Sequence, residues 1–209
     1  KWDEVDALAE RAYDEFGRID VLVNNAGMSP LYPSLGEIGE AQLEREDTDA
    51  ADAALDRAAG RLEQIDDADH LWLLATGTAI GPFISILRSD LPWQRFSRII
   101  LVHGVRTAEE LAYQDAIQGF RERDPEKFTM VPFVSREKVD YALEGRIPDA
   151  IANGELENRV GIDFSAAQSQ VMICGNKGMV QDTQRQLELL GLKKHRRSEP
   201  GQITTENYW

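Results

Sequence analysis

Ser135 and Arg136 place a hydroxyl and a guanidinium side by side, directly after an apolar run at residues 128–134. Arginine offers a planar fork of hydrogen-bond donors and a permanent charge, so this pair suits a phosphate monoester. An apolar run of this length indicates a buried strand, and parallel sheets bind their ligands beyond the carboxyl ends of strands. Arg106 follows another such run, at residues 98–103, in a similar way. The two arginines therefore predict a phosphate site, although each also fits an ordinary surface charge.

A glycine-bearing turn at Thr76, Gly77 and Thr78 is a second candidate for phosphate binding. It follows an apolar run at residues 71–75, and Pro82 is well placed to open the helix after it. In an open parallel sheet, a strand, a glycine turn and a helix in this order leave backbone N–H groups pointing at the crevice beyond the strand ends. The same order of elements is also that of an ordinary strand-to-helix turn.

Cys174 ends a further apolar run, at residues 171–174, and precedes Gly175. Taken alone, this cysteine is typical of a small buried hydrophobe rather than of a reactive group. No metal site or hydrolytic triad is predicted, because the chain has no G-x-S-x-G, H-E-x-x-H or Walker pattern. A hydrolytic side activity from residues that only the fold brings together stays open. The histidines stand singly, at His70, His103 and His195.

The elements that must position these residues alternate between strand and helix from residue 71 onward. This alternation predicts an α/β fold with an open, parallel, five-stranded, doubly wound sheet behind a helical, acidic N-terminal segment. The fifth strand is expected at the sheet edge, at residues 203–205. Beyond the helix that opens at Pro82, helices are expected at residues 109–123, 147–153 and 179–190, the last with Gly191 as its cap.

Acidic residues concentrate at the start of this 209-residue chain, whose net charge is −14. Residues 1–70 hold 19 acidic and 6 basic residues, whereas residues 71–209 hold 18 and 17. The overall charge argues against nucleic acid as a partner. The abrupt change in composition predicts two different segments, 1–68 and 69–209, joined in one chain.

The remaining composition is that of a soluble cytoplasmic protein. Hydrophobic residues make up 42% of the sequence, yet no apolar run has the length of a membrane span and no signal-peptide pattern opens the chain. Cys174 is the only cysteine, so an intrachain disulfide is impossible and a reducing compartment is expected.

Several of these motifs occur together, and in this order, in one known family. Residues 69–209 resemble the NADP-binding domain of bacterial ferredoxin-NADP reductases, whose LATGTGxxPF turn is similar to residues 71–83. Ordered motifs are together far more specific than any one of them. The other shared motifs are VHGVR at 102–106, VSRE at 134–137, GRIP at 145–148, MICGN at 172–176 and ENYW at 206–209.

The resemblance implies roles for the predicted phosphate ligands. In that family a Ser-Arg pair binds the 2′-phosphate that distinguishes NADP from NAD, and Ser135 and Arg136 match it. Arg146 stands where the family often has a second basic residue. The turn at residues 76–82 and Arg106 are expected to contribute to the same NADP(H) site.

The resemblance also implies a place for the nicotinamide and for a flavin. Cys174 and Gly175 match a Cys-Gly pair that lies beside the nicotinamide and helps to align hydride donor and acceptor. Tyr208 matches an aromatic that stacks on the flavin ring, Trp209 one that packs near the flavin's adenine, and Glu206 a carboxylate that some relatives keep near the nicotinamide. Cys174, Glu206 and Tyr208 are therefore the predicted catalytic residues. Without flavin, the aromatics would simply cover apolar surface.

The activity that the resemblance implies is hydride exchange between NADPH and a flavin, with ferredoxin or flavodoxin as partner. Members of the family carry FAD on a separate N-terminal β-barrel, and residues 1–70 show neither its alternating strands nor its Arg-x-Tyr-Ser/Thr motif. FAD is thus a possible cofactor whose binding domain is missing. The alternative is a non-catalytic or promiscuous NADP-binding fusion protein. A basic run either meets an acidic partner or is a solvated patch, and it comprises Lys193, Lys194, Arg196 and Arg197.

Residues 5–35 resemble a different family, the short-chain dehydrogenases, in which a helix ending FGxID precedes a strand ending NNAG. That family's glycine-rich TGxxxGxG turn and its Tyr followed four residues later by Lys are absent, so this stretch is predicted to be a structural remnant. We expect residues 1–68 either to pack over the surface that a flavin domain covers in the reductases or to mediate a homodimer that hides it.

Overall fold

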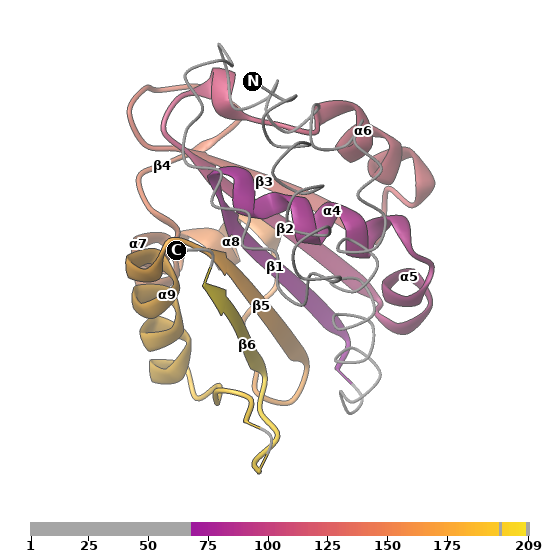
Figure 1. Ribbon diagram of the computed structural model, residues 1–209, viewed down its shortest axis with the longest axis vertical. Coiled ribbons are helices and arrows are strands. Elements are labelled where there is room, and N and C mark those ends of the chain that lie inside the picture. The colour runs from indigo at the N-terminus through magenta and orange to yellow at the C-terminus, as the bar shows by residue number, and fades with distance from the viewer. Residues whose placement is uncertain (1–67, 197, 208–209) are drawn as a thin grey trace, which may run out of the picture. The chain divides into compact units, whose positions relative to one another are not determined.

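The computed structural model describes residues 68–196 and 198–207, with the side chains of 206 and 207 left out. Six strands form one sheet in the order β4-β3-β2-β1-β5-β6, and every neighbouring pair is parallel (Figure 1). The strand order reverses direction at β1, as in other doubly wound folds. The strands are β1 (His70–Thr76), β2 (Arg98–Val105), β3 (Phe128–Val134), β4 (Leu143–Glu144), β5 (Ser169–Gly175) and β6 (Ile203–Asn207).

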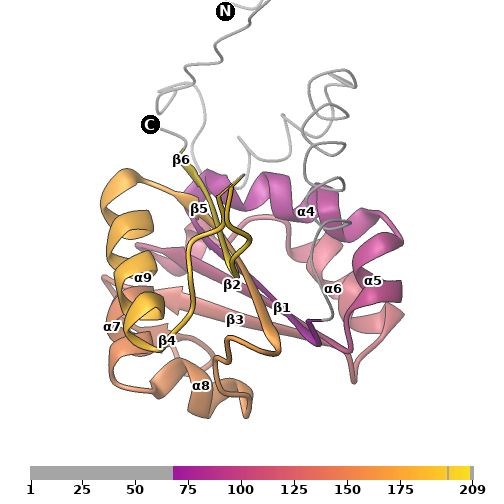
Figure 2. The same ribbon diagram turned by 90° about the horizontal axis from the view of Figure 1, so that it is seen from below.

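Helices cover both faces of this sheet (Figure 2). In β1, Leu71 and Leu73 pack toward α4, α5 and α6, whereas Trp72 and Leu74 pack toward α7, α8 and α9. All four side chains are fully buried, which explains why residues 71–75 are all apolar instead of alternating with polar residues. The helices are α4 (Gly81–Arg88), α5 (Leu91–Arg95), α6 (Gln114–Arg123), α7 (Ile147–Ala152), α8 (Glu155–Val160) and α9 (Lys177–Leu189), with 3₁₀ turns η1 (Gly77–Ile80) and η2 (Ala108–Glu110).

The α/β parallel sheet is confirmed, as are the five expected strands and the helices after Pro82 and at 147–153 and 179–190. Pro82 lies in the first turn of α4. Gly191 ends α9 with φ +90°, a left-handed conformation that glycine adopts without strain. Its N–H donates to Glu188 O, and the N–H of Leu192 donates to Leu187 O, both at 3.1 Å. This pair of bonds is the Schellman ending of a helix.

Two features of the predicted fold are corrected. The sheet has a sixth strand, β4, which is only two residues long and pairs with the end of β3. The helix expected at 109–123 is interrupted, because Tyr113 adopts a left-handed φ of 61° and α6 begins only at Gln114. The short helices α5 and α8 were not predicted.

The predictions for residues 1–67 lie outside the described residues, including the dehydrogenase-like stretch at 5–35 and the cover or dimer contact. Arg197, Tyr208 and Trp209 lie outside them as well. In the part of the chain that the structure describes, no helix is long and apolar enough to cross a membrane. The same residues contain no group of three or more His, Cys, Asp or Glu side chains placed to hold a metal ion.

Candidate functional site

The carboxyl ends of β1, β2, β3 and β5 meet at one edge of the sheet because these strands are parallel. Thr76, the last residue of β1, lies between two glycines at this edge. It is in register with Gly104 of β2, where an added Cβ would lie 3.2 Å from Thr76 Cγ2. On the other side, a Cβ on Gly175 of β5 would collide with Thr76 Oγ1. The two glycines therefore make room for the threonine side chain at the carboxyl ends of the strands.

The chain turns sharply after Thr76 and enters η1 and then α4. Gly77 takes the left-handed φ of 56° that this turn requires, a conformation that costs glycine little. The backbone N–H groups at the start of such a turn have no partner within the helix. The predicted order of strand, glycine turn and helix is thus present, with Thr76, Gly77, Thr78 and Pro82 in the expected places.

His103 contacts this turn from the neighbouring strand β2. Its Nε2 lies 2.9 Å from the carbonyl oxygen of Gly77, and its side chain is completely buried. Burial lowers the pKa of His103 to about 4, and the hydrogen bond to Gly77 and the charge of Glu110 only partly oppose this effect. The imidazole is therefore neutral at pH 7. Its Nδ1 has no hydrogen-bond partner among the described residues.

Sequence analysis did not predict the contact between His103 and Gly77. An isolated histidine in an apolar run does not indicate which residue it will contact. The only clue in the sequence was its position immediately before Gly104. The register that sets His103 opposite Ala75 of β1 is known only from the structure. Hydrogen bonding across 26 residues of sequence is visible only once the two strands are paired.

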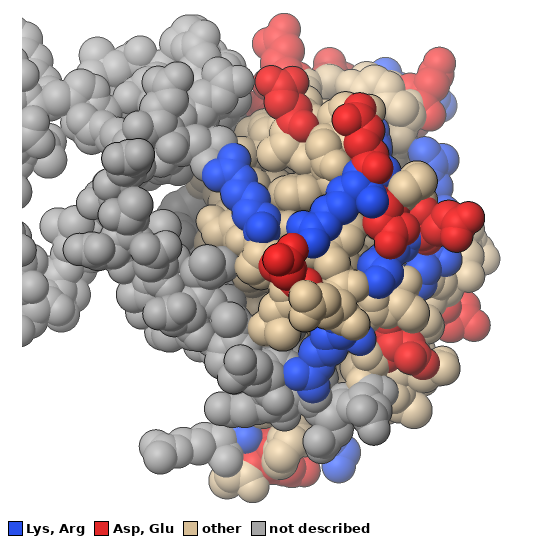
Figure 3. Space-filling view, turned by 90° about the vertical axis from the view of Figure 1, so that its right-hand side faces the viewer, with Lys and Arg blue, Asp and Glu red and all other residues tan. Residues whose placement is uncertain are grey.

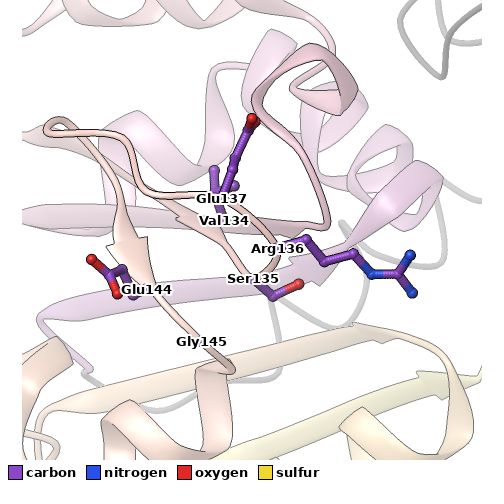
Figure 4. A pocket seen from close by; sticks show the side chains of 6 residues that line it. All are labelled: Val134, Ser135, Arg136, Glu137, Glu144 and Gly145. Carbon is purple, nitrogen blue, oxygen red and sulfur yellow. The ribbon is translucent and has the colours of Figure 1, made fainter.

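An open cavity of about 500 Å³ lies at the end of β3 (Figure 4). Ser135 and Arg136 extend toward the same side in this view, whereas Glu137 and Glu144 point away from them. The residues that line it are Val134, Ser135, Arg136, Glu137, Glu144 and Gly145.

Backbone hydrogen bonds fix Ser135 and Arg136 against the end of β2. The N–H of Ser135 donates to Val105 O at 3.1 Å, and its hydroxyl donates to the same oxygen at 3.2 Å. The N–H of Arg136 donates to Arg106 O at 2.8 Å. Glu137 also bridges the two loops, since its carboxylate accepts from the N–H of Ala108. The serine and the arginine therefore sit on a rigid strand end, and the Arg136 side chain is exposed.

The three predicted basic residues differ in their surroundings. Arg106 forms an ion pair with Glu110, with 3.1 Å between Nη2 and Oε1. Arg146 donates from Nη2 to Asp182 Oδ2 of α9 at 3.0 Å. Arg136 forms no ion pair with any other described residue, so of the three it meets a phosphate without first giving up a carboxylate.

Cys174 lies on β5 beside Ala75 and is almost completely buried. It belongs to the same apolar cluster as Phe83 of α4, in agreement with its interpretation as a small hydrophobe. Glu206 is its register partner on β6, but the side chain of Glu206 is outside the description. The backbone thus brings Cys174, Gly175 and Glu206 to the same end of the sheet as the turn at 76–78.

Charges elsewhere on the surface are mixed. Figure 3 shows Lys and Arg interspersed with Asp and Glu on the face that carries α5 and α6. There Arg123 pairs with Asp90 and also lies over the ring of Trp93, 4.5 Å from its centroid. Within the predicted basic run, Lys193 pairs with Glu199 at 3.6 Å. Among the described residues of these two regions, both signs of charge therefore lie side by side.

Comparison with known proteins identifies this fold. Residues 73–185 match the family model described as the oxidoreductase NAD-binding domain. The chain is 43% identical over 149 residues to the flavodoxin/ferredoxin–NADP reductase of Escherichia coli K12, and 36% identical over 146 residues to the ferredoxin–NADP reductase of Pseudomonas aeruginosa. The matches cover 71% and 66% of this chain and 60% and 56% of those proteins. The chain thus spans little more than half the length of the curated relatives it matches.

The fold also matches a solved structure, that of a ferredoxin NADP⁺ reductase from Neisseria gonorrhoeae with bound FAD and NADP. The TM-score is 0.66 at 35% sequence identity, and the match covers 70% of this chain and 59% of that one.

Proposed function

The chain belongs to the oxidoreductase NAD-binding domain family, and from this premise we propose that it binds NADP(H) and exchanges hydride with a flavin. The proposed NADP(H)-binding domain comprises residues 69–209, and residues 1–68 form a separate segment. The reductases from Escherichia coli and Pseudomonas aeruginosa support this assignment by their sequence similarity to the chain.

The observation that carries the proposal is the pairing of Ser135 with an arginine that no described carboxylate neutralises. A phosphate monoester offers several acceptor oxygens and a double charge, and Arg136 offers a fork of donors that matches it. NAD has a hydroxyl at the position where NADP has its 2′-phosphate. The site therefore favours NADP over NAD. Ser135 is a second donor once its hydroxyl turns from Val105 O to the phosphate. Arg106 and Arg146 can contribute once they release Glu110 and Asp182.

The proposed positions of the pyrophosphate and the nicotinamide follow from the residues at the carboxyl ends of β1 and β5. The turn at residues 76–78 is proposed to bind the pyrophosphate through its backbone N–H groups, because these lack partners within η1. Gly175 and Cys174 are proposed to border the nicotinamide, since β5 ends beside Thr76. The resemblance to the reductases implies the remaining roles in the proposal. Glu206 lies near the nicotinamide, Tyr208 stacks on the flavin ring and Trp209 packs near the adenine of the flavin.

Flavin, when bound, supplies the step between two-electron and one-electron chemistry that a nicotinamide cannot perform. This chain's own residues bind and orient NADPH for that transfer. We extend the proposal to ferredoxin or flavodoxin as electron acceptor, on the strength of the names of the relatives. The exposed side chains of Lys193, Lys194 and Arg196 are candidates for contact with such an acidic partner.

The test is to supply the full-length chain with NADPH and free FAD or FMN and to follow oxidation of the nicotinamide by absorbance. The proposal expects faster oxidation than in the same mixture without protein, and slower oxidation with NADH. Tight NADPH binding without any acceleration would contradict the oxidoreductase proposal and leave the alternative, a non-catalytic NADP-binding protein.

A further inference from the structure

We propose that His103 is a positioning residue for the dinucleotide: its hydrogen bond to Gly77 holds the glycine turn in the orientation that presents the N–H of Thr78 to the pyrophosphate. The inference rests on the proposed NADP(H)-binding function and adds to it a residue outside the turn itself. His103 touches no part of the cofactor in this proposal and acts through Gly77.

The tautomer of His103 follows from its partner. A carbonyl oxygen only accepts hydrogen bonds, so the Nε2 atom that lies 2.9 Å from Gly77 O must carry the proton. The neutral imidazole then has a bare lone pair on Nδ1. That atom is buried and has no partner among the described residues. If this side chain only filled space, an apolar residue would do so without burying a polar Nδ1 atom that has no partner. The hydrogen bond at Nε2 is therefore the interaction that favours histidine at this position.

The glycine turn needs such an anchor from outside. Glycine adopts positive and negative φ with similar ease, so Gly77 alone does not decide which way its following peptide unit faces. The described residues contain no cis peptide bond, and in a trans peptide the C=O and N–H groups point in opposite directions. Fixing Gly77 C=O toward the buried imidazole therefore directs the N–H of Thr78 away from β2.

The strand register makes this contact possible. β1 and β2 run in parallel with Ala75 opposite His103, which places the histidine one residue before the end of β1 and beside the turn that follows. The next residue of β2, Gly104, lies opposite Thr76 and leaves space for it. Two successive residues of β2 thus adjoin the turn: His103 forms the hydrogen bond to Gly77, and Gly104 leaves room for Thr76.

The experiment compares His103→Gln with His103→Met in the full-length chain. Glutamine places an amide N–H close to the position of Nε2, whereas methionine has similar size and no donor. His103→Asn serves as a second variant without the contact, because its amide stops near the position of Nδ1. His70→Met is the matched control, since His70 lies on β1 at the opposite end of the sheet. Calorimetric titration measures the binding of NADP⁺ and of adenosine 2′,5′-bisphosphate, which has the 2′-phosphate but lacks the second pyrophosphate phosphorus and the nicotinamide.

The proposal expects His103→Met and His103→Asn to bind NADP⁺ about threefold to tenfold more weakly, the loss of one hydrogen bond. Binding of adenosine 2′,5′-bisphosphate should change less than twofold, and His103→Gln and His70→Met should resemble the wild-type protein. Equal weakening of both nucleotides, or none in any folded variant, would overturn the inference. If the wild-type chain binds neither nucleotide, the proposed function has failed, and the inference fails with it.

Discussion

Arg136 and Arg106 carry the same charge and follow neighbouring strands, yet they are not equivalent. Arg106 is paired with Glu110 at 3.1 Å, whereas Arg136 has no ion pair with a described residue. Sequence analysis predicted both as phosphate ligands, since both follow strand ends. It could not rank them, because the carboxylate that pairs with Arg106 is indistinguishable in sequence from any other acidic residue of a surface turn.

Replacing Arg136 should therefore alter cofactor choice. Arg136→Ala removes a charge-assisted contact worth about 1.5 to 3 kcal/mol, so NADP⁺ should bind roughly ten- to hundredfold more weakly while NAD⁺ changes little. Calorimetric titration of both dinucleotides measures the effect, with Arg121→Ala on the exposed side of α6 as control. Equal weakening of NADP⁺ and NAD⁺ would show that Arg136 does not contact the 2′-phosphate.

His103 should impose a pH dependence on stability. Its pKa falls from 6.5 in the unfolded chain to about 4 in the folded protein. Between these values the unfolded state binds more protons, so the contribution of His103 to stability is complete above pH 6.5 and is lost as the pH falls toward 4. The total is on the order of 3 kcal/mol.

Denaturant unfolding of wild-type protein and of His103→Gln, at a series of pH values from 7 down to about 4, tests this dependence. Glutamine keeps the contact to Gly77 but does not titrate, so the wild-type protein should lose stability relative to the variant as the solution is acidified. Burial also lowers the pKa of His70, but that residue is present in both proteins and its effect cancels. Parallel stability curves would contradict a buried neutral His103.

The longer elements were predictable because their patterns are unambiguous. The middle residues of β1 and β5 are buried on both faces, so residues 71–75 and 171–174 form apolar runs that sequence alone identifies. β4 has two residues and is held by pairing with Phe133 and Val134, which leaves no periodic signal. α5 and α8 have five and six residues, too few for a helical repeat to show. The late start of α6 depends on the conformation of Tyr113, a residue whose type does not favour left-handed φ.

The contact between the ends of β1 and β5 should tolerate no added side chain. In Gly175→Ala the new methyl group would collide with Thr76 Oγ1 and lie 2.5 Å from Met179 Cε. Such overpacking should destabilise the protein by about 1 to 3 kcal/mol. Gly119→Ala on α6 is the matched control: nothing lies within 4 Å of its Cβ, and alanine should stabilise the helix by about 0.5 to 1 kcal/mol. Similar melting temperatures for both variants would refute the close approach of β1 and β5.

At the scale of the whole molecule, sequence analysis predicted the fold class, which the structure confirms. It also predicted a phosphate site at the carboxyl ends of the strands, which stays a prediction. Both follow from alternating strands and helices and from polar residues that stand directly after apolar runs. The cooperation of His103 with Gly77 could not be predicted, since it depends on the lateral register of two strands. The same limit applies to the pairing of Arg146 with Asp182, which are 36 residues apart.

The acidic segment 1–68 should affect the solution behaviour of the remainder. If it covers apolar surface or mediates a dimer, a shortened protein that begins at Asp69 should be less soluble or should differ from the full-length chain in oligomeric state. Size-exclusion chromatography and thermal unfolding of the two proteins measure this. Equal solubility, a monomer in both cases and equal resistance to heat would show that the segment covers nothing.

The central claim is that this chain binds NADP(H) and selects it over NAD(H) by the 2′-phosphate. The most direct test is calorimetric titration of the full-length protein with NADP⁺ and with NAD⁺ in the same buffer at low ionic strength. We expect NADP⁺ to bind at one site per chain and NAD⁺ to bind at least about tenfold more weakly, because one charge-assisted contact is absent. Equal affinities for the two dinucleotides, or no binding of either, would contradict the claim.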